Sequence, residues 1–286
     1  MADHAHIFPI TKMSEIFQVS RSGYYRWLGH TPSKRAIQNQ RLRKAIRRVW
    51  EGSRKKYGSP RIYRQLKTEG WQVSRQRIAR LMVVMGIASQ IRRKWVKTTD
   101  SNHRWPVAAN LLERKFSPDK LGRAWVSDIT FIPSEQGWLY LTIVMDLADR
   151  QIIGWSLSEG MSAEQTSMSA FKQALARRNL GRELIFHSDQ GVQYACGDFS
   201  ALLDKHHITQ SMSRKGNCWD NAPAESFFKT LKYEMDMPDR YESYQQARKA
   251  IFEFIEIWYN RHRLHSALDY QTPVQTEQNL KHKPAA

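Results

Sequence analysis

The chain has 286 residues, a formal net charge of +18 and two cysteines. Its length is enough for two or three domains, and the cysteine count excludes a small scaffold held together by disulfide bonds. We find no signal peptide and no apolar run long enough to cross a bilayer, so we expect a reducing, intracellular location.

The positive charge is concentrated in one segment. Residues 31–105 contain 21 Lys and Arg residues against three acidic residues, so they account for the whole net charge. Apolar residues at helical spacing, such as Trp50, Ile62 and Ile78, accompany these charges. The combination indicates a folded module that binds a polyanion and argues against the alternative, a disordered basic arm.

Helical signals dominate the first part of the chain. Ser20 offers an N-cap within the first pair of helices, and Pro60 suits the first turn of a later one. The expected helices cover residues 10–28 (two short helices), 37–52, 60–67 and 75–84.

The tetrapeptide Gln-Val-Ser-Arg occurs twice, at 18–21 and 72–75, each time at a turn between two helices. This weak repeat predicts helix-turn-helix units, in which the second helix lies in the major groove of DNA. Arg and Gln side chains can pair with guanine and adenine edges. The residues expected to do so are Arg75, Gln76, Arg77 and Arg80. A helical hairpin without a DNA role is the alternative.

A polar linker is expected at 92–122, and from residue 124 the pattern changes to strands. The order βββ-α-β-α-β-α predicts a mixed sheet with helices on its faces. The expected strands are 124–132, 138–147, 150–157, 183–187 and 208–212, and the expected helices are 163–178, 199–206 and 243–260, besides one after the fifth strand. The tail, Gln271–Ala286, is expected to be poorly ordered.

The helix after the fifth strand carries a charged face. Pro223 suits its first turn, and either Asp220 or Asn221 can cap it. Three charged residues recur at i, i+4 and i+7 on this helix: Glu225, Lys229 and Lys232. A surface ion pair between the first two is the plain alternative.

Three carboxylates occupy positions that local structure does not explain. Asp128 lies within an apolar strand, Asp189 ends a buried strand, and Glu225 begins the helix that follows the last strand. Brought together they would repel one another, and divalent cations with hard oxygen ligands would relieve this repulsion. Three other acids are expected to be turn or capping residues: Asp146, Asp149 and Asp220.

Three blocks of the chain resemble insertion-sequence transposases with a DDE catalytic triad. The blocks are Trp125–Thr130, His187–Tyr194 and Asp220–Lys232, and 35 residues separate Asp189 from Glu225. The resemblance covers nearly the whole chain. It points to the IS-three family, in the protein of the second reading frame, whose catalytic core is similar to that of retroviral integrases.

The resemblance implies an RNase H-like core in which Asp128, Asp189 and Glu225 bind two Mg²⁺ or Mn²⁺ ions. It implies strand cleavage by water and strand transfer by a 3′-hydroxyl, and it places Lys229 and Lys232 against the transposon-end DNA. Four further residues match the family's motifs and are expected to shape the pocket: His187, Gln190, Asn217 and Asn221.

Retroviral integrases carry an amino-terminal zinc module with paired His and Cys. Here His4, His6 and His30 precede any cysteine by well over a hundred residues, so no structural zinc is expected. The implied partners are double-stranded DNA (terminal repeats and target), further copies of the chain and the protein of an upstream reading frame. The implied location is the bacterial cytoplasm, in association with the nucleoid.

The sequence therefore predicts a transposase, an α/β protein with an all-α DNA-binding region. The rival interpretations are a DNA-binding regulator with an inactive core and an RNase H-type nuclease without strand transfer. The expected parts are a helix-turn-helix-like segment (1–34), a basic helix-turn-helix domain (35–97), a linker (98–118), the RNase H-like core (119–237) and a C-terminal helix and tail (238–286).

Overall fold

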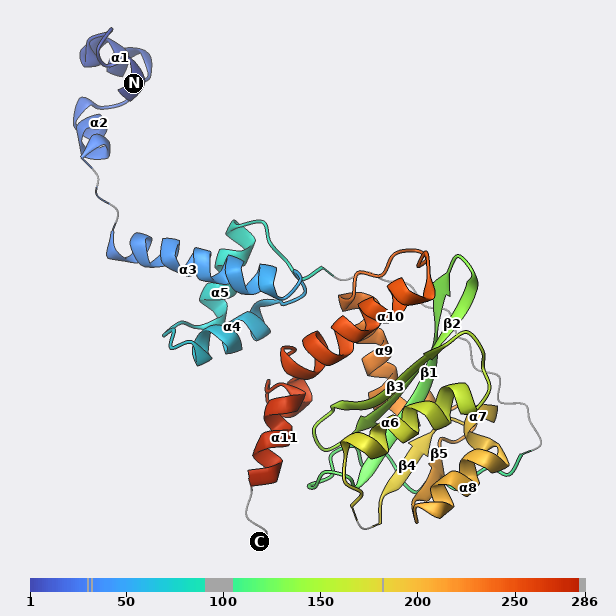
Figure 1. Ribbon diagram of the computed structural model, residues 1–286. Coiled ribbons are helices and arrows are strands. Elements are labelled where there is room, and N and C mark those ends of the chain that lie inside the picture. The colour runs from blue at the N-terminus through green and yellow to red at the C-terminus, as the bar shows by residue number, and fades with distance from the viewer. Residues whose placement is uncertain (30, 32, 91–104, 182, 283–286) are drawn as a thin grey trace. The chain divides into compact units, whose positions relative to one another are not determined.

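The computed structural model describes residues 1–29, 31, 33–90, 105–181 and 183–282. The chain divides into two compact units, Met1–Ala88 and Ser89–Ala286 (Figure 1). The first unit is built from helices, and the second contains a five-stranded sheet.

The helices of the first unit follow the expected pattern. They are α1 (Ile10–Ile16), α2 (Arg21–Leu28), α3 (Lys34–Gly52), α4 (Ser59–Thr68) and α5 (Arg75–Val84). The apolar stripes of α3, α4 and α5 meet in a small core, in which Ile46, Ile62 and Ile78 are fully buried. The basic residues of α3 remain on its exposed side.

The two copies of Gln-Val-Ser-Arg begin their helices in the same way. The Ser20 hydroxyl accepts a hydrogen bond from the Gly23 amide at 3.0 Å, and the Ser74 hydroxyl accepts one from the Arg77 amide at 3.3 Å. Each serine thus satisfies an amide that the first helical turn leaves without a partner. The cap expected at Ser20 is confirmed, and Ser74 caps its helix in the same way.

The sheet of the second unit has the strand order β3-β2-β1-β4-β5. Strands β1, β2 and β3 are antiparallel, whereas β4 and β5 run parallel to β1. The bounds are β1 (Ala124–Ser134), β2 (Gly137–Asp146), β3 (Ile152–Ser158), β4 (Ile185–Ser188) and β5 (Thr209–Met212). This is the mixed sheet that the sequence predicts.

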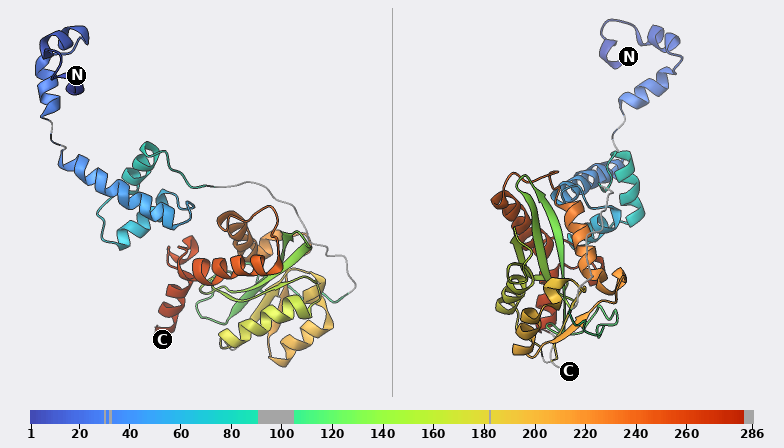
Figure 2. Two further views of the ribbon diagram at one scale, coloured as in Figure 1. Left: turned by 45° about the horizontal axis from the view of Figure 1, so that its top comes forward. Right: turned by 90° about the vertical axis from the view of Figure 1, so that its right-hand side faces the viewer.

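Helices cover both faces of the sheet (Figures 1 and 2). One face carries α6 (Ser169–Arg177), α7 (Val192–Ala195) and α8 (Gly197–Lys205), and α9 (Ala222–Glu234) contacts β1. Phe171 of α6 packs in the core against Trp125 of β1 and Phe186 of β4. Gly154 on β3 permits α6 to approach, because a Cβ there would lie 2.2 Å from the Ala170 carbonyl oxygen.

Three expectations need correction. The tail is ordered in part: residues Pro273–His282 form α11, which is joined to the core by a buried ion-pair network. The long helix expected at 243–260 is α10 (Tyr244–Phe252), continued by a π-helical segment (Glu253–Tyr259). The helix expected at 163–178 likewise starts with a π-helical segment (Glu164–Met168) before α6.

Part of the expected linker packs against the sheet. Residues 91–104 lie outside the described part of the chain. Beyond them, the Ala109 carbonyl accepts a hydrogen bond from the Met212 amide at 3.4 Å, and Leu112 is buried. The segment around residues 108–112 therefore packs beside β5 and supports the end of the sheet.

Candidate active site

Two of the predicted acids meet because of strand register. In the parallel pair of β1 and β4, Val126 lies opposite His187. Asp128 and Asp189 each lie two residues further on, and side chains two apart on a strand point to the same face. Neighbouring strands are about 4.8 Å apart, so both carboxylates emerge side by side where the parallel pairing ends.

The third acid joins them from α9, which contacts β1. Burial raises the pKa of Asp128 well above its usual range, and the charges of Asp189 and Glu225 raise it further. The Ile129 amide, which donates a hydrogen bond to Asp128 at 2.9 Å, opposes this increase in pKa. The structure thus brings Asp189 and Glu225 each within electrostatic range of Asp128.

The lysines of α9 divide into two environments. Lys232 is half-buried, and its positive charge lowers the pKa of Asp128. Lys229 and Glu225 are both exposed, and no ion pair joins them among the side chains that the structure describes. The plain alternative of a surface ion pair between them is therefore absent here.

The donor set suits a divalent cation. Within the described ranges, no three His, Cys, Asp or Glu side chains are already gathered closely enough to hold a metal ion. The carboxylates are nevertheless hard oxygen donors whose mutual repulsion a cation would relieve. A second observation agrees: the buried Asn221 Oδ1 has no hydrogen-bond partner among the described residues.

The position of that oxygen is well determined by the other end of the amide. Asn221 Nδ2 donates to the Ser127 carbonyl at 3.1 Å, directly before Asp128. A carbonyl cannot accept from another carbonyl, so the amide nitrogen must face Ser127 and the amide oxygen is left over. Such an oxygen can accept a hydrogen bond from any N–H or O–H donor, and a water is one such donor.

His187 proves to be a buried support. Ser211 Oγ accepts from the Leu111 amide at 2.9 Å and from the Leu112 amide at 3.3 Å, so its own hydrogen is available to His187 Nδ1 at 2.9 Å. The other ring nitrogen, Nε2, then donates to Ser213 Oγ at 3.1 Å. Burial lowers the pKa of His187 to about 4, which keeps the ring neutral.

The other residues expected in the pocket also hold the surrounding loop. Gln190 Nε2 donates to the Ser213 carbonyl at 2.9 Å, and Asn217 Oδ1 accepts from Arg114 Nη2 at 3.1 Å. Together with His187 and Asn221 they tie the loops to the sheet, so positioning is the role that their contacts indicate.

Asp220 does not cap α9, contrary to one of the two expectations for that helix. Its buried carboxylate accepts from Arg114 Nε at 2.9 Å and from Arg214 Nε and Nη2, both at 2.8 Å. These guanidinium groups hold the pKa of Asp220 well below its usual range. Asn221 occupies the cap position, but its side chain makes no capping hydrogen bond. Arg114 was missed because no local pattern connects it with a residue 106 positions away.

Tyr194 lies beneath the acids. Its buried hydroxyl shares a hydrogen bond of 2.7 Å with Ser127 Oγ. Burial raises the pKa of Tyr194 well above its usual range, and the charges of Asp128 and Asp189 raise it further. The phenol is therefore neutral, and it helps to fix β1 at the residue before Asp128.

The residues expected to read DNA bases do not all have the same surroundings. Arg75, Gln76 and Arg80 are exposed on α5. Arg77 instead donates from Nε to Asn39 Oδ1 at 3.1 Å and from Nη2 to Gln38 Oε1 at 2.9 Å. Its guanidinium thus joins α5 to α3 and stabilises the packing of the two helices.

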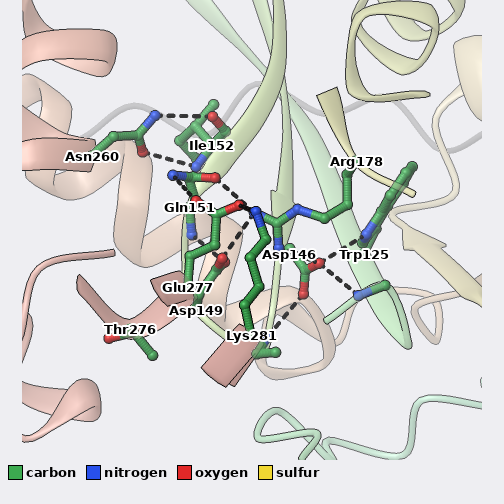
Figure 3. A network of polar contacts seen from close by, with 12 residues as sticks. Trp125, Asp146, Asp149, Gln151, Ile152, Arg178, Asn260, Thr276, Glu277 and Lys281 are labelled. Carbon is green, nitrogen blue, oxygen red and sulfur yellow. Dashed lines mark hydrogen bonds and ion pairs between the residues drawn. The ribbon is translucent and has the colours of Figure 1, made fainter. Parts of the chain in front are cut away.

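A second charged cluster lies at the other end of the sheet (Figure 3). Arg178 binds Asp146 at 3.0 Å and Asp149 at 2.9 Å, and Glu277 of α11 lies 3.5 Å from the same guanidinium. The two aspartates also accept from the Ala148 and Gln151 amides, so the turn role expected for them is confirmed. The pairing with Arg178 was not foreseen.

Comparison with known proteins places the chain in a family. The family described as HTH-like domain matches residues 38–95, and two families described as Integrase core domain match residues 118–218 and 206–273. No described helix is long and apolar enough to span a membrane.

Two relatives extend over almost the whole chain. The "Insertion element IS600 uncharacterized 31 kDa protein" of Shigella sonnei is 40% identical, over 92% of this chain and 96% of its own length. "Transposase InsF for insertion sequence IS3A" of Escherichia coli (strain K12) is 36% identical, over 96% of each chain.

Among solved structures, the HTLV-2 integrase catalytic core domain in complex with magnesium (trimeric form) is 18% identical, with a TM-score of 0.41. It covers 55% of this chain and 97% of that one. The family matches and the two relatives, together with the mixed sheet and the helical DNA-binding region, confirm the resemblance seen in the sequence. The chain is a transposase of the IS3 family, with an HTH-like region followed by an RNase H-like integrase core.

Proposed function

We propose that this transposase is a DDE polynucleotidyl transferase whose triad is Asp128, Asp189 and Glu225. The proposal rests on the meeting of these acids at β1, the end of β4 and α9, where the charges of Asp189 and Glu225 both raise the pKa of Asp128. Two Mg²⁺ or Mn²⁺ ions bound by the triad would activate the attacking oxygen and stabilise the leaving oxygen of an in-line phosphoryl transfer.

The surrounding residues have supporting roles in this proposal. Asn221 Oδ1, which has no hydrogen-bond partner among the described residues, would accept a hydrogen bond from a water of the bound ions. Lys232 balances part of the negative charge of Asp128, and the exposed Lys229 binds a phosphate of the transposon end.

DNA is bound by the first unit through two sets of exposed residues. Arg75, Gln76 and Arg80 contact base edges from α5. A row of exposed basic residues on α3 contacts phosphates, which adds affinity without sequence preference. The row consists of Arg41, Arg43, Lys44 and Arg47.

The active assembly contains more than one copy of the chain, because two transposon ends must be joined to one target. The protein of an upstream reading frame adds end recognition. In the proposed division of the chain, the DNA-binding parts are 1–34 and 35–97, the linker is 98–118, and the core is 119–237, followed by 238–286. The contacts of residues 108–112 with β5 support counting the later part of the linker with the core.

The test is strand transfer of labelled terminal-repeat DNA with Mg²⁺ or Mn²⁺, compared with the same reaction in EDTA. We expect metal-dependent joined product, and we expect Glu225→Gln and Asp128→Asn to lower its rate at least about a thousandfold. Asp204→Asn, an exposed acid on α8, is the matched control and should retain full activity.

Two results would contradict the proposal. Full strand transfer by Asp128→Asn would remove the triad from the mechanism and favour the regulator with an inactive core. Metal-dependent cleavage without any joined product, even with the upstream-frame protein added, would favour a nuclease.

A further inference from the structure

One large aromatic side chain beside the candidate active site lies in solvent. Trp219 is 69% exposed, whereas Trp125, Trp155 and Trp258 of the same unit are buried. Leaving an indole in water forgoes the hydrophobic stabilisation that burial would bring, about 25 cal/mol for each Å² of apolar surface. An indole held in this way is suited to a partner that covers it.

The residues that follow Trp219 hold its backbone in place. Trp219 lies in a short 3₁₀ turn, Cys218–Asn221, directly before α9. The next residue, Asp220, is buried and held by Arg114 and Arg214. Asn221 is fastened to the Ser127 carbonyl. Charge-assisted, bidentate contacts of this kind hold geometry well, and here they hold the indole outward.

The indole is close to the acids and to positive charge. Trp219 precedes Glu225 by six residues, and the rise of a 3₁₀ turn followed by an α-helix separates their backbones by about 10 Å at most. A stacked DNA strand advances 3.4 Å per nucleotide, so this distance is about three nucleotides. The exposed Lys229 lies on the same helix as Glu225. Positive charge combined with an exposed aromatic ring is typical of surfaces that bind single-stranded or unpaired nucleic acid.

We propose that Trp219 stacks on an unpaired DNA base within about three nucleotides of the phosphate at which the triad acts. The stacking proposal rests on the proposed function, because it assumes that the triad acts on a DNA strand. It adds that this strand passes the 3₁₀ turn. Trp219 is a positioning residue: by holding one base outside the duplex, it fixes the neighbouring phosphate at the carboxylates.

The first experiment measures steady-state strand transfer with a pre-cleaved terminal-repeat duplex. Stacking of one base is worth about 1–3 kcal/mol, so Trp219→Ala should lower kcat/KM by about 5- to 150-fold. Trp219→Phe keeps an aromatic face and should retain most of the activity, whereas Trp219→Leu, of similar hydrophobicity, should behave like Trp219→Ala.

The control is Trp138→Ala, which removes another exposed tryptophan, 57% exposed at the start of β2. In the antiparallel pair Trp138 lies opposite Pro133, five residues along β1 from Asp128, which corresponds to about 17 Å. This variant should retain wild-type kcat/KM.

The second experiment does not depend on catalysis. The fluorescent base 2-aminopurine is placed in turn at each of the last four positions of the terminal-repeat duplex. In complexes with the wild type and Trp138→Ala, fluorescence at one position should be quenched by the indole. With Trp219→Ala the same position should be bright.

Three outcomes would overturn the proposal: equal fluorescence with wild type and Trp219→Ala at every position, full activity of Trp219→Leu, or a change in the sedimentation of DNA-free protein on Trp219→Ala. The last would assign the indole to a contact between protein chains. Quenching by the wild type without any joined product, even with the upstream-frame protein added, would support the stacking and contradict the proposed function. Joined product formed at the same rate by the wild type and Trp219→Ala would support the proposed function and contradict the stacking.

Discussion

The donor and the acceptor can be assigned in the hydrogen bond between His187 and Ser211. Ser211 Oγ accepts two backbone amides, so it donates to the imidazole, and the ring must accept at Nδ1. Protonation of Nδ1 would place two donors against each other inside the sheet. Burial lowers the pKa of His187 and outweighs the nearby Asp220, which raises it. Family resemblance found this residue, but only its contacts show that it supports the site.

This arrangement predicts a pH-dependent loss of stability. The pKa of His187 is lowered to about 4 in the folded chain from 6.5, so below pH 6.5 the unfolded chain binds more protons. Stability from this group is complete above pH 6.5 and is lost as pH falls toward 4, by about 3 kcal/mol in total.

Urea unfolding of the metal-free protein in EDTA, at intervals from pH 7.5 to 4.5, measures the effect. His187→Gln should show a flatter decline in unfolding free energy than the wild type, and His6→Gln, at an exposed position, should follow the wild type. An identical decline in His187→Gln and wild type would refute the assignment.

Among the elements, α5 shows how one helix can divide its basic residues between folding and binding. Arg77 faces α3 and is satisfied by Asn39 and Gln38, whereas Arg75 and Arg80 face solvent. Sequence analysis grouped all three, because helical spacing alone does not show which side of α5 lies against α3. The Ser74 cap fixes where the helix starts and therefore which residues project on each side.

Alanine variants of α5 should separate these roles. Arg80→Ala should weaken binding to terminal-repeat DNA by about 1–3 kcal/mol and leave the unfolding midpoint unchanged. Arg77→Ala should lower unfolding stability by about 1–2 kcal/mol through its lost hydrogen bonds with α3.

Fluorescence anisotropy with specific and scrambled duplexes, together with thermal unfolding of each full-length variant, gives both quantities. Arg41→Ala on α3 serves as a phosphate-contact control and should weaken both duplexes equally. If Arg77→Ala weakened DNA binding and left the unfolding midpoint unchanged, Arg77 would be a DNA-binding residue and not a residue that stabilises the fold.

At the scale of the whole catalytic unit, Arg178 joins segments that are distant in the sequence. Its guanidinium connects the end of α6 with the acids of the β2–β3 turn and with Glu277 on α11 (Figure 3). Lys281 adds a cation to Glu277 at 2.7 Å. Opening this cluster would leave Asp146 and Asp149 as buried charges without a cation, so it couples the C-terminal helix to the stability of the sheet.

Arg178→Met should therefore destabilise the chain by about 3–5 kcal/mol, because one partner of a buried ion-pair network is removed. The neighbouring Arg177→Met is the matched control: it breaks the more exposed pair with Glu256 and should cost no more than about 1 kcal/mol. Urea unfolding gives both values, and hydrogen exchange should show faster exchange in Pro273–His282 only for Arg178→Met. Equal losses of unfolding free energy in the two variants would show that the buried network stabilises the fold no more than the exposed ion pair does.

The sequence by itself determined the order of strands and helices, the Ser20 cap, the family and the three acids of the candidate triad. These features are local: they depend on strand and helix periodicity, on capping chemistry and on motifs within short stretches. Asp128 and Asp189 were identifiable because a carboxylate is out of place in an apolar strand or at its end. The roles of the triad, the domain boundaries and the DNA contacts remain predictions.

Tertiary structure alone decided which partner each buried polar group takes. Asp220 could cap α9 by local rules, yet two guanidinium groups bind it instead, because bidentate charge-assisted hydrogen bonds are stronger than a single cap. The same applies to Arg77, to the tail that became α11 and to Arg178. Apart from the contact of Arg214 with Asp220, which lies six residues away, these contacts join residues tens of positions or more apart. Only the packing of sheet and helices brings such residues within hydrogen-bond distance.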